Sequence, residues 1–264
     1  MESIVNHLKL LRTQKPLVQN ITNHVVMNNT ANALLAVGAS PIMSHAHNEV
    51  EDMVKIISSL VINIGTLDEY WVDSMLLASK KANEAAKPWL LDPVGAGATS
   101  YRNEVLTRLL SFYPSVIRGN ASEILALSKE NIVSKGVDST HQSEQALNAA
   151  MALSLQNRCI VCVSGETDFV VSGNTYTSIL NGHPMMASVT GMGCTASALI
   201  GAVLAVEKDP FKATVSGMAI MGIAGEMAGE KSNGPGTFQV NFYDSLYQLE
   251  PGIIEKRVKI QKER

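Results

Sequence analysis

The stretch "LVINIGTLDEYWVDSMLLASKKANEAAKPWLLDPVG", residues 60–95, contains two short apolar runs separated by a longer amphipathic segment. The runs "LVINIG" and "PWLLDPVG" have the length of strands, and their nearly continuous apolar character is typical of strands buried on both faces. The segment between them, "EYWVDSMLLASKKANEAAK", has the pattern of a helix. A strand, a helix and a second strand in this order predict a βαβ unit, and therefore a parallel sheet.

The same alternation continues on both sides of this unit. The other apolar runs are "PLVQNIT" (16–22), "SPIMSH" (40–45), "SVIRGN" (115–120) and "CIVCVSGE" (159–166), and helix-like segments such as "NTANALLAVG" (29–38) lie between them. We therefore expect an α/β fold with three layers, in which helices cover both faces of a central, mostly parallel sheet.

The second half of the chain has a different pattern. A hairpin is predicted at "DFVVSGNTYTSIL" (168–180), with its turn at Gly173 and Asn174. From Cys194 onward the pattern is mostly helical, at about 194–206, 210–230 and 235–249. No linker, charge run or low-complexity stretch marks a boundary, so residues 1–264 are expected to form a single domain.

Composition argues against several classes of protein. The chain has 264 residues, a net charge of −3 and only 5% aromatic residues, so nothing favours nucleic acid or an anionic membrane surface. The N-terminus, "MESIVNHLKLLRTQK", does not have the apolar region of a signal peptide, and no apolar run approaches the ~20 residues of a membrane span. Three cysteines do not suggest a disulfide framework. We expect a cytoplasmic protein that binds neither nucleic acid nor membranes.

Polar or glycine residues end each of the apolar runs. In open parallel sheets, ligands bind beyond the carboxyl ends of the strands, so one crevice is expected to collect these groups. The pattern predicts a small-molecule site and leaves its chemistry open. The residues concerned are Asn20, Asn23, Ser44, Gly65, Asp92, Arg118 to Asn120 and Ser164 to Glu166.

The segment "VTGMGCTASALI" (189–200) predicts a tight loop that leads into a helix. Gly191 and Gly193 allow a sharp turn and a close approach to a ligand. A helix that starts at Gly193 or Cys194 presents free N–H groups that suit an anion, with phosphate the obvious candidate. The same field is expected to lower the pKa of Cys194. The alternative is that Cys194 is a small residue buried in a glycine-rich bend, and the local sequence favours neither.

Three further strand-end positions have both a functional and a structural explanation. Asp92 in "LLDPVGAG" can support Mg²⁺ or a metal-bound water, or it can simply cap a turn. In "RGNASEIL", Arg118 suits a triphosphate, while Asn120 and Glu123 form a capping-box pattern for a helix that starts at Ala121. Glu123 is also placed to support Mg²⁺ or its waters. Ser164 in "VSGETD" can donate to a phosphate or serve as an ordinary turn serine.

Two motifs that suggest metal binding have simpler explanations. Cys159 and Cys162 have C-x-x-C spacing, but residues three apart on a strand point to opposite faces of the sheet. The two thiols are therefore not placed to bind one metal ion, and both residues are expected in the core. His45 and His47 in "SHAHNE" have no accompanying cysteine or further ligand, and are expected to be ordinary loop histidines.

These motifs together resemble the hydroxyethylthiazole kinase family, of the ribokinase-like superfamily, over nearly the whole chain. The glycine loop alone would be a weak signal, whereas the combination is specific. The resemblance is carried by "VQNITNHVVMNNTANALLAVGASPIMSHA", "INIGTL", "LDPVGAGAT", "IRGNASEI" and "ASVTGMGCTASALIGA".

The resemblance implies a ribokinase-like fold and an enzyme of thiamin salvage. The implied reaction is phosphoryl transfer from ATP to the hydroxyl of 4-methyl-5-(2-hydroxyethyl)thiazole with Mg²⁺, in a homotrimer whose substrate site lies near a subunit boundary. The motif matches imply that Met43 contacts the thiazole, that Gly191 lines the substrate site and that Asn23 lies near the substrate. They also imply that Arg118 and Ser164 bind ATP. Asp92 and Glu123 are implied to support Mg²⁺.

The resemblance also suggests a role for Cys194. Many ribokinase-like enzymes have an Asp base at this position, whereas the thiazole kinases have Cys. We therefore hypothesise that Cys194 is the catalytic base for the substrate hydroxyl. A base need contribute little here, because phosphoryl transfer depends mainly on positioning and charge stabilisation.

Three alternatives remain open. The first is a ribokinase-like kinase for another small vitamin-precursor alcohol. The second is a thiol-dependent hydrolase or acyltransferase built on Cys194, which would need neither ATP nor Mg²⁺. The third is a ligand-binding sensor without turnover.

Overall fold

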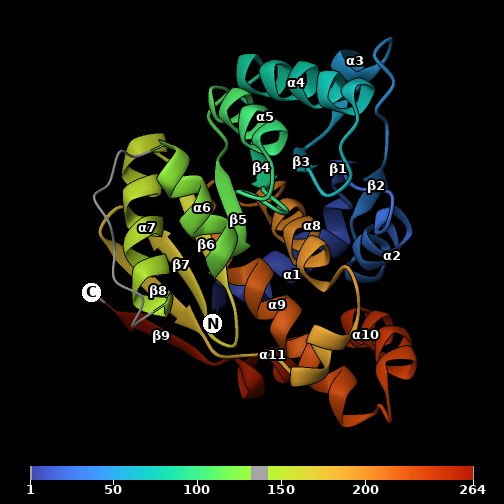
Figure 1. The fold of residues 1–264 in the computed structure, drawn as a ribbon. Coiled ribbons are helices and arrows are strands. Elements are labelled where there is room, and N and C mark those ends of the chain that lie inside the picture. Colours follow the sequence, from blue (N-terminus) through green and yellow to red (C-terminus); the bar gives the residue numbers. More distant parts are fainter. Residues whose placement is uncertain (1, 132–141, 264) are drawn as a thin grey trace.

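The computed structural model of the chain describes residues 2–131 and 142–263. Within these residues a nine-stranded sheet runs in the order β2-β1-β3-β4-β5-β6-β7-β8-β9 (Figure 1). The strands are β1 (Leu17–Ile21), β2 (Ser40–Ile42), β3 (Ser59–Asn63), β4 (Trp89–Asp92), β5 (Val116–Asn120), β6 (Ile160–Ser164), β7 (Asp168–Ser172), β8 (Thr175–Ile179) and β9 (Ile260–Glu263).

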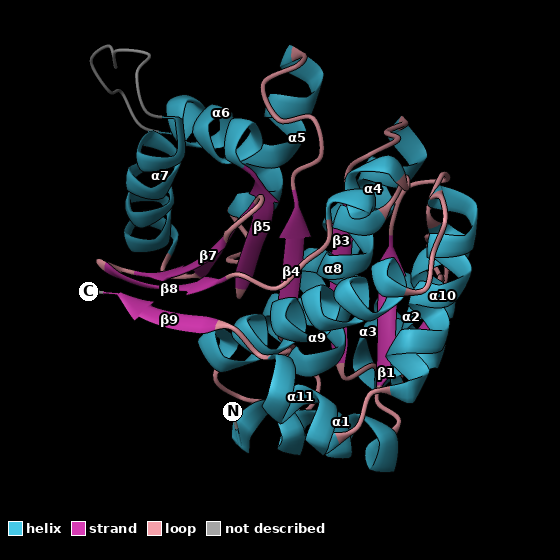
Figure 2. Ribbon diagram, turned by 90° about the horizontal axis from the view of Figure 1, so that it is seen from below, coloured by secondary structure: helices cyan, strands magenta, loops and turns pink. Residues whose placement is uncertain are grey.

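The sheet is parallel from β2 to β6 and antiparallel from β6 to β9. Figure 2 shows β7, β8 and β9 at one end of the sheet. The predicted hairpin is confirmed as β7 and β8, and Gly173 in its turn has φ +59°, in the left-handed region that favours glycine. The C-terminal strand β9, which pairs with β8, was not predicted.

Helices cover both faces of the sheet, which confirms the predicted three-layer α/β/α architecture. One core lies between the sheet and α1 (Glu2–Gln14), α2 (Met27–Val37), α8 (Met192–Leu204), α9 (Pro210–Glu230), α10 (Pro235–Gln248) and α11 (Pro251–Arg257), with the 3-10 helix η1 (Pro184–Ser188) against it. The second core lies beneath α3 (Val50–Ile56), α4 (Glu69–Glu84), α5 (Ser100–Leu110), α6 (Ala121–Asn131) and α7 (Gln142–Asn157).

Alternation along the strands decides which side chains meet α8. Val61 of β3 and Leu90 of β4 belong to the core beneath α8, whereas Leu60 belongs to the opposite core. Asn63 and Asp92 lie two residues beyond Val61 and Leu90 and are paired in the sheet register. Their side chains therefore also face α8, at the carboxyl ends of their strands.

The predicted helices after the hairpin are confirmed, with small changes at their ends. α9 spans Pro210–Glu230 as expected, and α10 ends at Gln248. α8 begins at Met192, earlier than the predicted start, because Gly191 takes φ +83° and so ends the preceding loop. None of the helices in the described part of the chain is both long and apolar enough to cross a membrane.

Several connections from a helix to the next parallel strand use a residue other than glycine in the left-handed region. Lys15, Ala86, Tyr113 and Arg158 have φ between 47° and 53° and follow the ends of α1, α4, α5 and α7. Gly38 occupies the corresponding position after α2. A residue with a Cβ pays a conformational cost in this region, so these positions are sites of local strain.

Candidate active site

The structure brings four of the predicted site residues together at the carboxyl ends of the strands. Arg118 Nη1 lies 4.0 Å from Asp92 Oδ2, and Arg118 Nη2 donates a hydrogen bond to Ser164 Oγ. Asp92 and Cys194 are joined through a residue that the sequence analysis did not select, Asn63, whose Nδ2 donates to Asp92 Oδ2 at 2.7 Å and to Cys194 Sγ at 3.2 Å. The cluster spans β3 to β6 and the start of α8, and we call it the strand-end cluster.

Asp92 is the buried acid of this cluster. Its side chain is 0% exposed, and Oδ2 also accepts a hydrogen bond from Ser197 Oγ at 2.8 Å. Burial raises the pKa of Asp92 to about 6, and the nearby Arg118 guanidinium opposes that shift. The other carboxylate oxygen, Oδ1, is buried without a hydrogen-bond partner. Such an oxygen is an open acceptor for a cation or a water.

Arg118 is the buried cation of the cluster. Burial acts to lower its pKa, but the carboxylates of Asp92, Asp168 and Glu123 prevail and raise it. Its Nε is buried without a hydrogen-bond partner. A Cβ added to Gly193 would lie 2.7 Å from Arg118 Nη1, so the guanidinium lies directly against the start of α8. Glycine at position 193 makes this close approach possible.

The start of α8 adds backbone donors beside Arg118. The N-cap Gly191 has no capping side chain, and the first helical bond runs from Thr195 N to Gly191 O at 2.8 Å. The N–H groups of Met192, Gly193 and Cys194 therefore have no partner within the helix. A Cβ on Gly191 would lie 2.6 Å from Val26, so glycine is required here by space as well as by its φ. Free N–H groups beside a guanidinium make an anion site.

The prediction that the helix start lowers the pKa of Cys194 is wrong. Burial raises the pKa of this half-buried thiol to about 11, and the Asp92 carboxylate raises it further. The amide groups of Asn63 and Asn23 and the Arg118 guanidinium oppose the shift without overcoming it. The thiol is therefore protonated at neutral pH. The neighbouring donors favour the thiolate, but the loss of contact with water on burial outweighs them.

Glu123 lies in the first turn of α6, which follows β5 directly. Its Oε2 accepts a hydrogen bond from Asn120 N at 2.8 Å and its Oε1 one from Gly95 N at 3.0 Å. Asn120 Oδ1 in turn accepts from Glu123 N at 2.9 Å, which confirms the predicted capping box. Glu123 therefore holds the loop after β4 against the start of α6, with its carboxylate one strand away from Asp92.

Met43 lies at the other side of the carboxyl edge, just beyond the end of β2. Its carbonyl is 3.1 Å from His45 Nδ1. The His45 ring packs on Trp71 of α4 with 3.9 Å between ring centroids, and His45 O accepts a hydrogen bond from Ser74 Oγ. The loop that bears Met43 is thus held on α4.

The residues set aside as metal-site candidates have the structural roles that were expected. Cys159 and Cys162 are buried in opposite cores, and burial raises the pKa of both thiols. His45 packs on Trp71, and His47 stacks on Tyr70 at 3.8 Å. In the part of the chain that the structure describes, no group of three or more His, Cys, Asp and Glu side chains could hold a metal.

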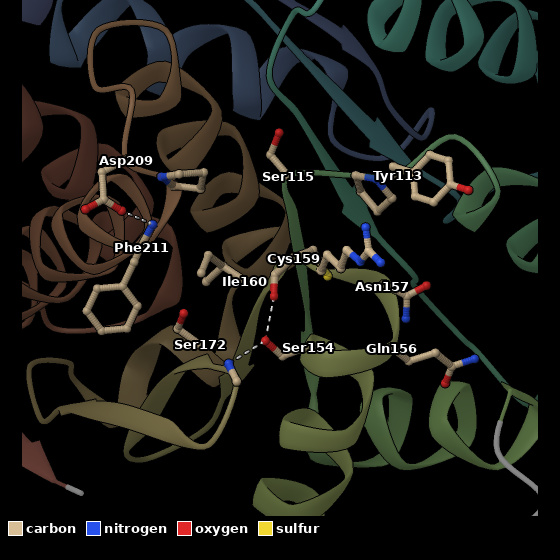
Figure 3. Close-up of a pocket in the computed structure, with 14 residues that line it drawn as sticks. Tyr113, Ser115, Ser154, Gln156, Asn157, Cys159, Ile160, Ser172, Asp209 and Phe211 are labelled. Carbon is tan, nitrogen blue, oxygen red and sulfur yellow. Dashed lines mark hydrogen bonds between the residues drawn. The ribbon is translucent and has the colours of Figure 1, made fainter.

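A cavity of about 1020 Å³ lies at the opposite end of the sheet (Figure 3). Its lining includes Ser115 and Cys159, which precede β5 and β6, and Phe211 at the start of α9. The strand-end cluster is at the carboxyl ends of the same strands. This cavity and the strand-end cluster therefore lie at different places in the fold.

Asn63 and Ser197 are the site residues that the sequence analysis missed. An amide at a strand end is a weak signal because it resembles any polar strand terminus. Ser197 could have been found from its spacing, since it lies one helical turn after Cys194 and so shares its face of α8.

The strand-end cluster fits phosphate and a divalent cation. Arg118 and the free N–H groups of α8 supply positive charge, while Asp92 Oδ1 is an unused oxygen. Mg²⁺ is commonly held by one or two carboxylates together with waters and substrate phosphates, so a full protein cage is not required. The residues present therefore fit a cation shared with a phosphate group.

Comparison with known proteins gives a consistent picture. A sequence profile described as "Hydroxyethylthiazole kinase family" matches residues 8–252. A hydroxyethylthiazole kinase from Leptospira biflexa serovar Patoc is 53% identical over 259 residues, which is 98% of this chain and 97% of that protein.

Solved structures agree on the fold. A hydroxyethylthiazole kinase protein from Pyrococcus horikoshii OT3 superposes with a TM-score of 0.94 at 44% identity, covering 100% of both chains. A ribokinase-like superfamily protein from Enterococcus faecalis V583 superposes with a TM-score of 0.66 at 13% identity, covering 91% of this chain and 86% of that one. The second likeness concerns the fold alone, and it confirms the expected ribokinase-like architecture.

Proposed function

The chain belongs to the hydroxyethylthiazole kinase family, and we propose that it transfers the γ-phosphoryl group of ATP to the hydroxyl of 4-methyl-5-(2-hydroxyethyl)thiazole. The observation behind this proposal is the strand-end cluster, in which a buried carboxylate, a buried guanidinium and a helix start converge. Phosphoryl transfer needs charge stabilisation and alignment more than covalent chemistry, and the cluster supplies both.

The positive groups of the cluster are proposed to bind the phosphates. Arg118 lies between Ser164 and Gly193, so its guanidinium reaches both the strand end and the start of α8. Ser164 and Arg118 would hold ATP, and the free N–H groups of Gly193 and Cys194 would face the phosphoryl group in transfer. Gly191 would allow that loop to approach the substrate closely.

Asp92 and Glu123 are proposed to hold Mg²⁺ or its waters. Bound Mg²⁺ would neutralise negative charge on the phosphates. Asp92 is the stronger candidate because its Oδ1 has no partner. Both oxygens of Glu123 already accept backbone hydrogen bonds, so its contribution would be through the remaining lone pairs or a bridging water.

Cys194 is proposed to lie beside the substrate hydroxyl as the catalytic base. Its pKa of about 11 in the free protein makes it a scarce base at neutral pH. A loose transition state demands little of the base, so a protonated thiol is compatible with turnover and predicts a rate that increases with pH. Met43 is proposed to pack its thioether against the thiazole ring, and Asn23 to lie near the substrate.

We also propose that the protein is a cytoplasmic homotrimer of thiamin salvage, with the substrate site near a subunit boundary. Support comes from exposed apolar side chains around α2 and α10, two helices in contact: Val25 is 59%, Leu35 60%, Val240 62% and Tyr247 74% exposed. The start of α2 also packs against Gly191, so this exposed apolar face adjoins the loop that is proposed to approach the substrate. Light scattering of the purified protein would measure the subunit number.

A substrate panel tests the proposed function. With ATP and Mg²⁺, we expect ADP release to depend on hydroxyethylthiazole and to be much slower with pyrimidine-type alcohols. Release only with another alcohol would indicate a different ribokinase-like kinase. Acyl transfer without ATP that alkylation abolishes would favour a thiol-dependent enzyme, and thermal stabilisation by the thiazole without ADP would favour a sensor.

A further inference from the structure

Asn63 is buried at the centre of the strand-end cluster, between the acid and the thiol. It is the last residue of β3, is 1% exposed, and pairs with Asp92 in the sheet register. Both residues face α8, which bears Cys194. No polar atom of Asn63 is left without a partner, since Oδ1 accepts two hydrogen bonds and Nδ2 donates two.

The orientation of the Asn63 amide is fixed by a backbone group. Gly65 N–H donates to Asn63 Oδ1 at 3.0 Å, and a backbone N–H can only donate. Oδ1 must therefore be the oxygen, and Nδ2 must be the donor to Asp92 Oδ2 and Cys194 Sγ. A flipped amide would place two donors against each other at Gly65 and two acceptors together at Asp92.

The neighbouring amide, Asn23, is fixed in the same way. Val25 N–H donates to Asn23 Oδ1 at 3.1 Å, so Asn23 Nδ2 is the donor to Asn63 Oδ1 at 2.8 Å and to Cys194 Sγ at 3.5 Å. The sulfur thus faces two N–H donors whose direction is set by the backbone. The position of Cys194 Sγ is coupled to that of Asp92, because Asn63 Nδ2 donates to both.

We propose that Asn63 is a positioning residue for phosphoryl transfer, which holds Cys194 Sγ and the Asp92 carboxylate in one fixed arrangement. This inference rests on the proposed function, because the arrangement matters only if both groups serve the same reaction. Asn63 keeps the carboxylate and the sulfur apart, since each takes a different N–H of one amide. Displacement of a reacting group by about 1 Å can cost about 100-fold in rate, so the loss of this amide should be felt mainly in kcat.

The chain offers a matched control on the same strand. Ser59 is the first residue of β3, is 0% exposed, and its Oγ donates to Gly201 O on α8 at 2.6 Å. Ser59→Ala therefore also removes a buried hydrogen bond between β3 and α8, but at the amino end of the strand. A general loosening of this contact would affect both variants alike.

A double-mutant cycle tests the proposal. We expect Asn63→Ala to lower kcat about 10- to 100-fold while the KM for ATP changes little, and Ser59→Ala to leave kcat unchanged. In a Cys194→Ala background, the effect of Asn63→Ala on kcat should be smaller than in the unsubstituted chain, because one of the two groups that Asn63 holds is gone. An equal loss in both backgrounds, or an unchanged kcat, would overturn the proposal.

A second measurement does not depend on the reaction. Asn63→Leu keeps the approximate size of the side chain but removes its N–H donors without placing a second carboxyl group beside Asp92, and it serves as the alternative if Asn63→Ala does not fold. We expect alkylation of Cys194 by iodoacetamide, followed by mass spectrometry of its peptide, to slow about tenfold at pH 8.5 in this variant and to be unchanged in Ser59→Ala. An unchanged alkylation rate would refute the positioning of Cys194 by Asn63. Lack of thiazole-dependent ADP release by the unsubstituted chain would refute the proposed function instead.

Discussion

Replacement of Asp92 by Asn should remove activity, and it should also make the free energy of unfolding depend less on pH. Asp92 is fully buried, and its pKa is raised to about 6. The folded state therefore binds a proton at this carboxyl more tightly than the unfolded chain does. The stabilising effect of protonation is present at low pH and is lost as the pH rises through the folded pKa.

The size of this effect follows from the two pKa values. With an unfolded pKa of about 3.9 and a folded pKa of about 6, ionisation of Asp92 lowers the free energy of unfolding by about 2 kcal/mol between pH 4.5 and pH 8. Asn cannot ionise, so the variant should not show this loss. Asp168, whose pKa is also raised to about 6, remains in both proteins, so the difference between them isolates Asp92.

Urea unfolding followed by circular dichroism at pH 4.5 and pH 8 measures the effect. Hydrogen-bond changes caused by the substitution contribute equally at both pH values and cancel in the comparison. Between pH 4.5 and pH 8, the unsubstituted chain should lose about 2 kcal/mol more of its free energy of unfolding than the variant does. The same pH dependence in both proteins would refute the reasoning that Asp92 is held ionised at a cost to stability. Turnover should fall at least about 100-fold at either pH.

Three other predictions follow from the same geometry. Because kcat/KM reports the free enzyme, it should increase with pH from 7 to 9 as the Cys194 thiol, with a pKa of about 11, begins to ionise, and pH profiles of Cys194→Ala should lack that increase. A Cβ on Gly193 would lie 2.7 Å from Arg118 Nη1. Gly193→Ala should therefore raise the KM for ATP or lower kcat about tenfold, with little change in melting temperature. Unchanged kinetics would show that the guanidinium is not held against the start of α8. Ala86 has φ +51°, so Ala86→Gly should raise the free energy of unfolding by about 0.5–1 kcal/mol in urea, and a loss of stability would contradict the assigned strain.

Much of the fold could be predicted from hydrophobic patterns. The strands beneath two helical layers are apolar over their whole length, as "LVIN" and "WLLD" show, and this distinguishes buried parallel strands from exposed ones. β9 could not be predicted in the same way. Its sequence, Ile260–Glu263, is short and charged, as suits an edge strand, and only its pairing with β8 makes it a strand.

The site was predictable in its location but not in its energetics. Strand-end positions identified Asp92, Arg118 and Ser164, which the structure brings together. The raised pKa of Cys194 could not be derived, because it depends on burial and on the distance to Asp92, which are properties of the folded chain. Asn63 was missed for a related reason, since its importance lies in the partners that it joins.

The most direct test of the central claim is to measure thiazole phosphate and ADP together, by mass spectrometry, after incubation of the chain with ATP, Mg²⁺ and hydroxyethylthiazole. We predict equal amounts of the two products, a loss of at least about 100-fold in Asp92→Asn, and no change in Ser115→Ala, which alters the cavity at the opposite end of the sheet (Figure 3). Absence of thiazole phosphate, or a loss in Ser115→Ala with Asp92→Asn unaffected, would contradict the assignment of phosphoryl transfer to the strand-end cluster.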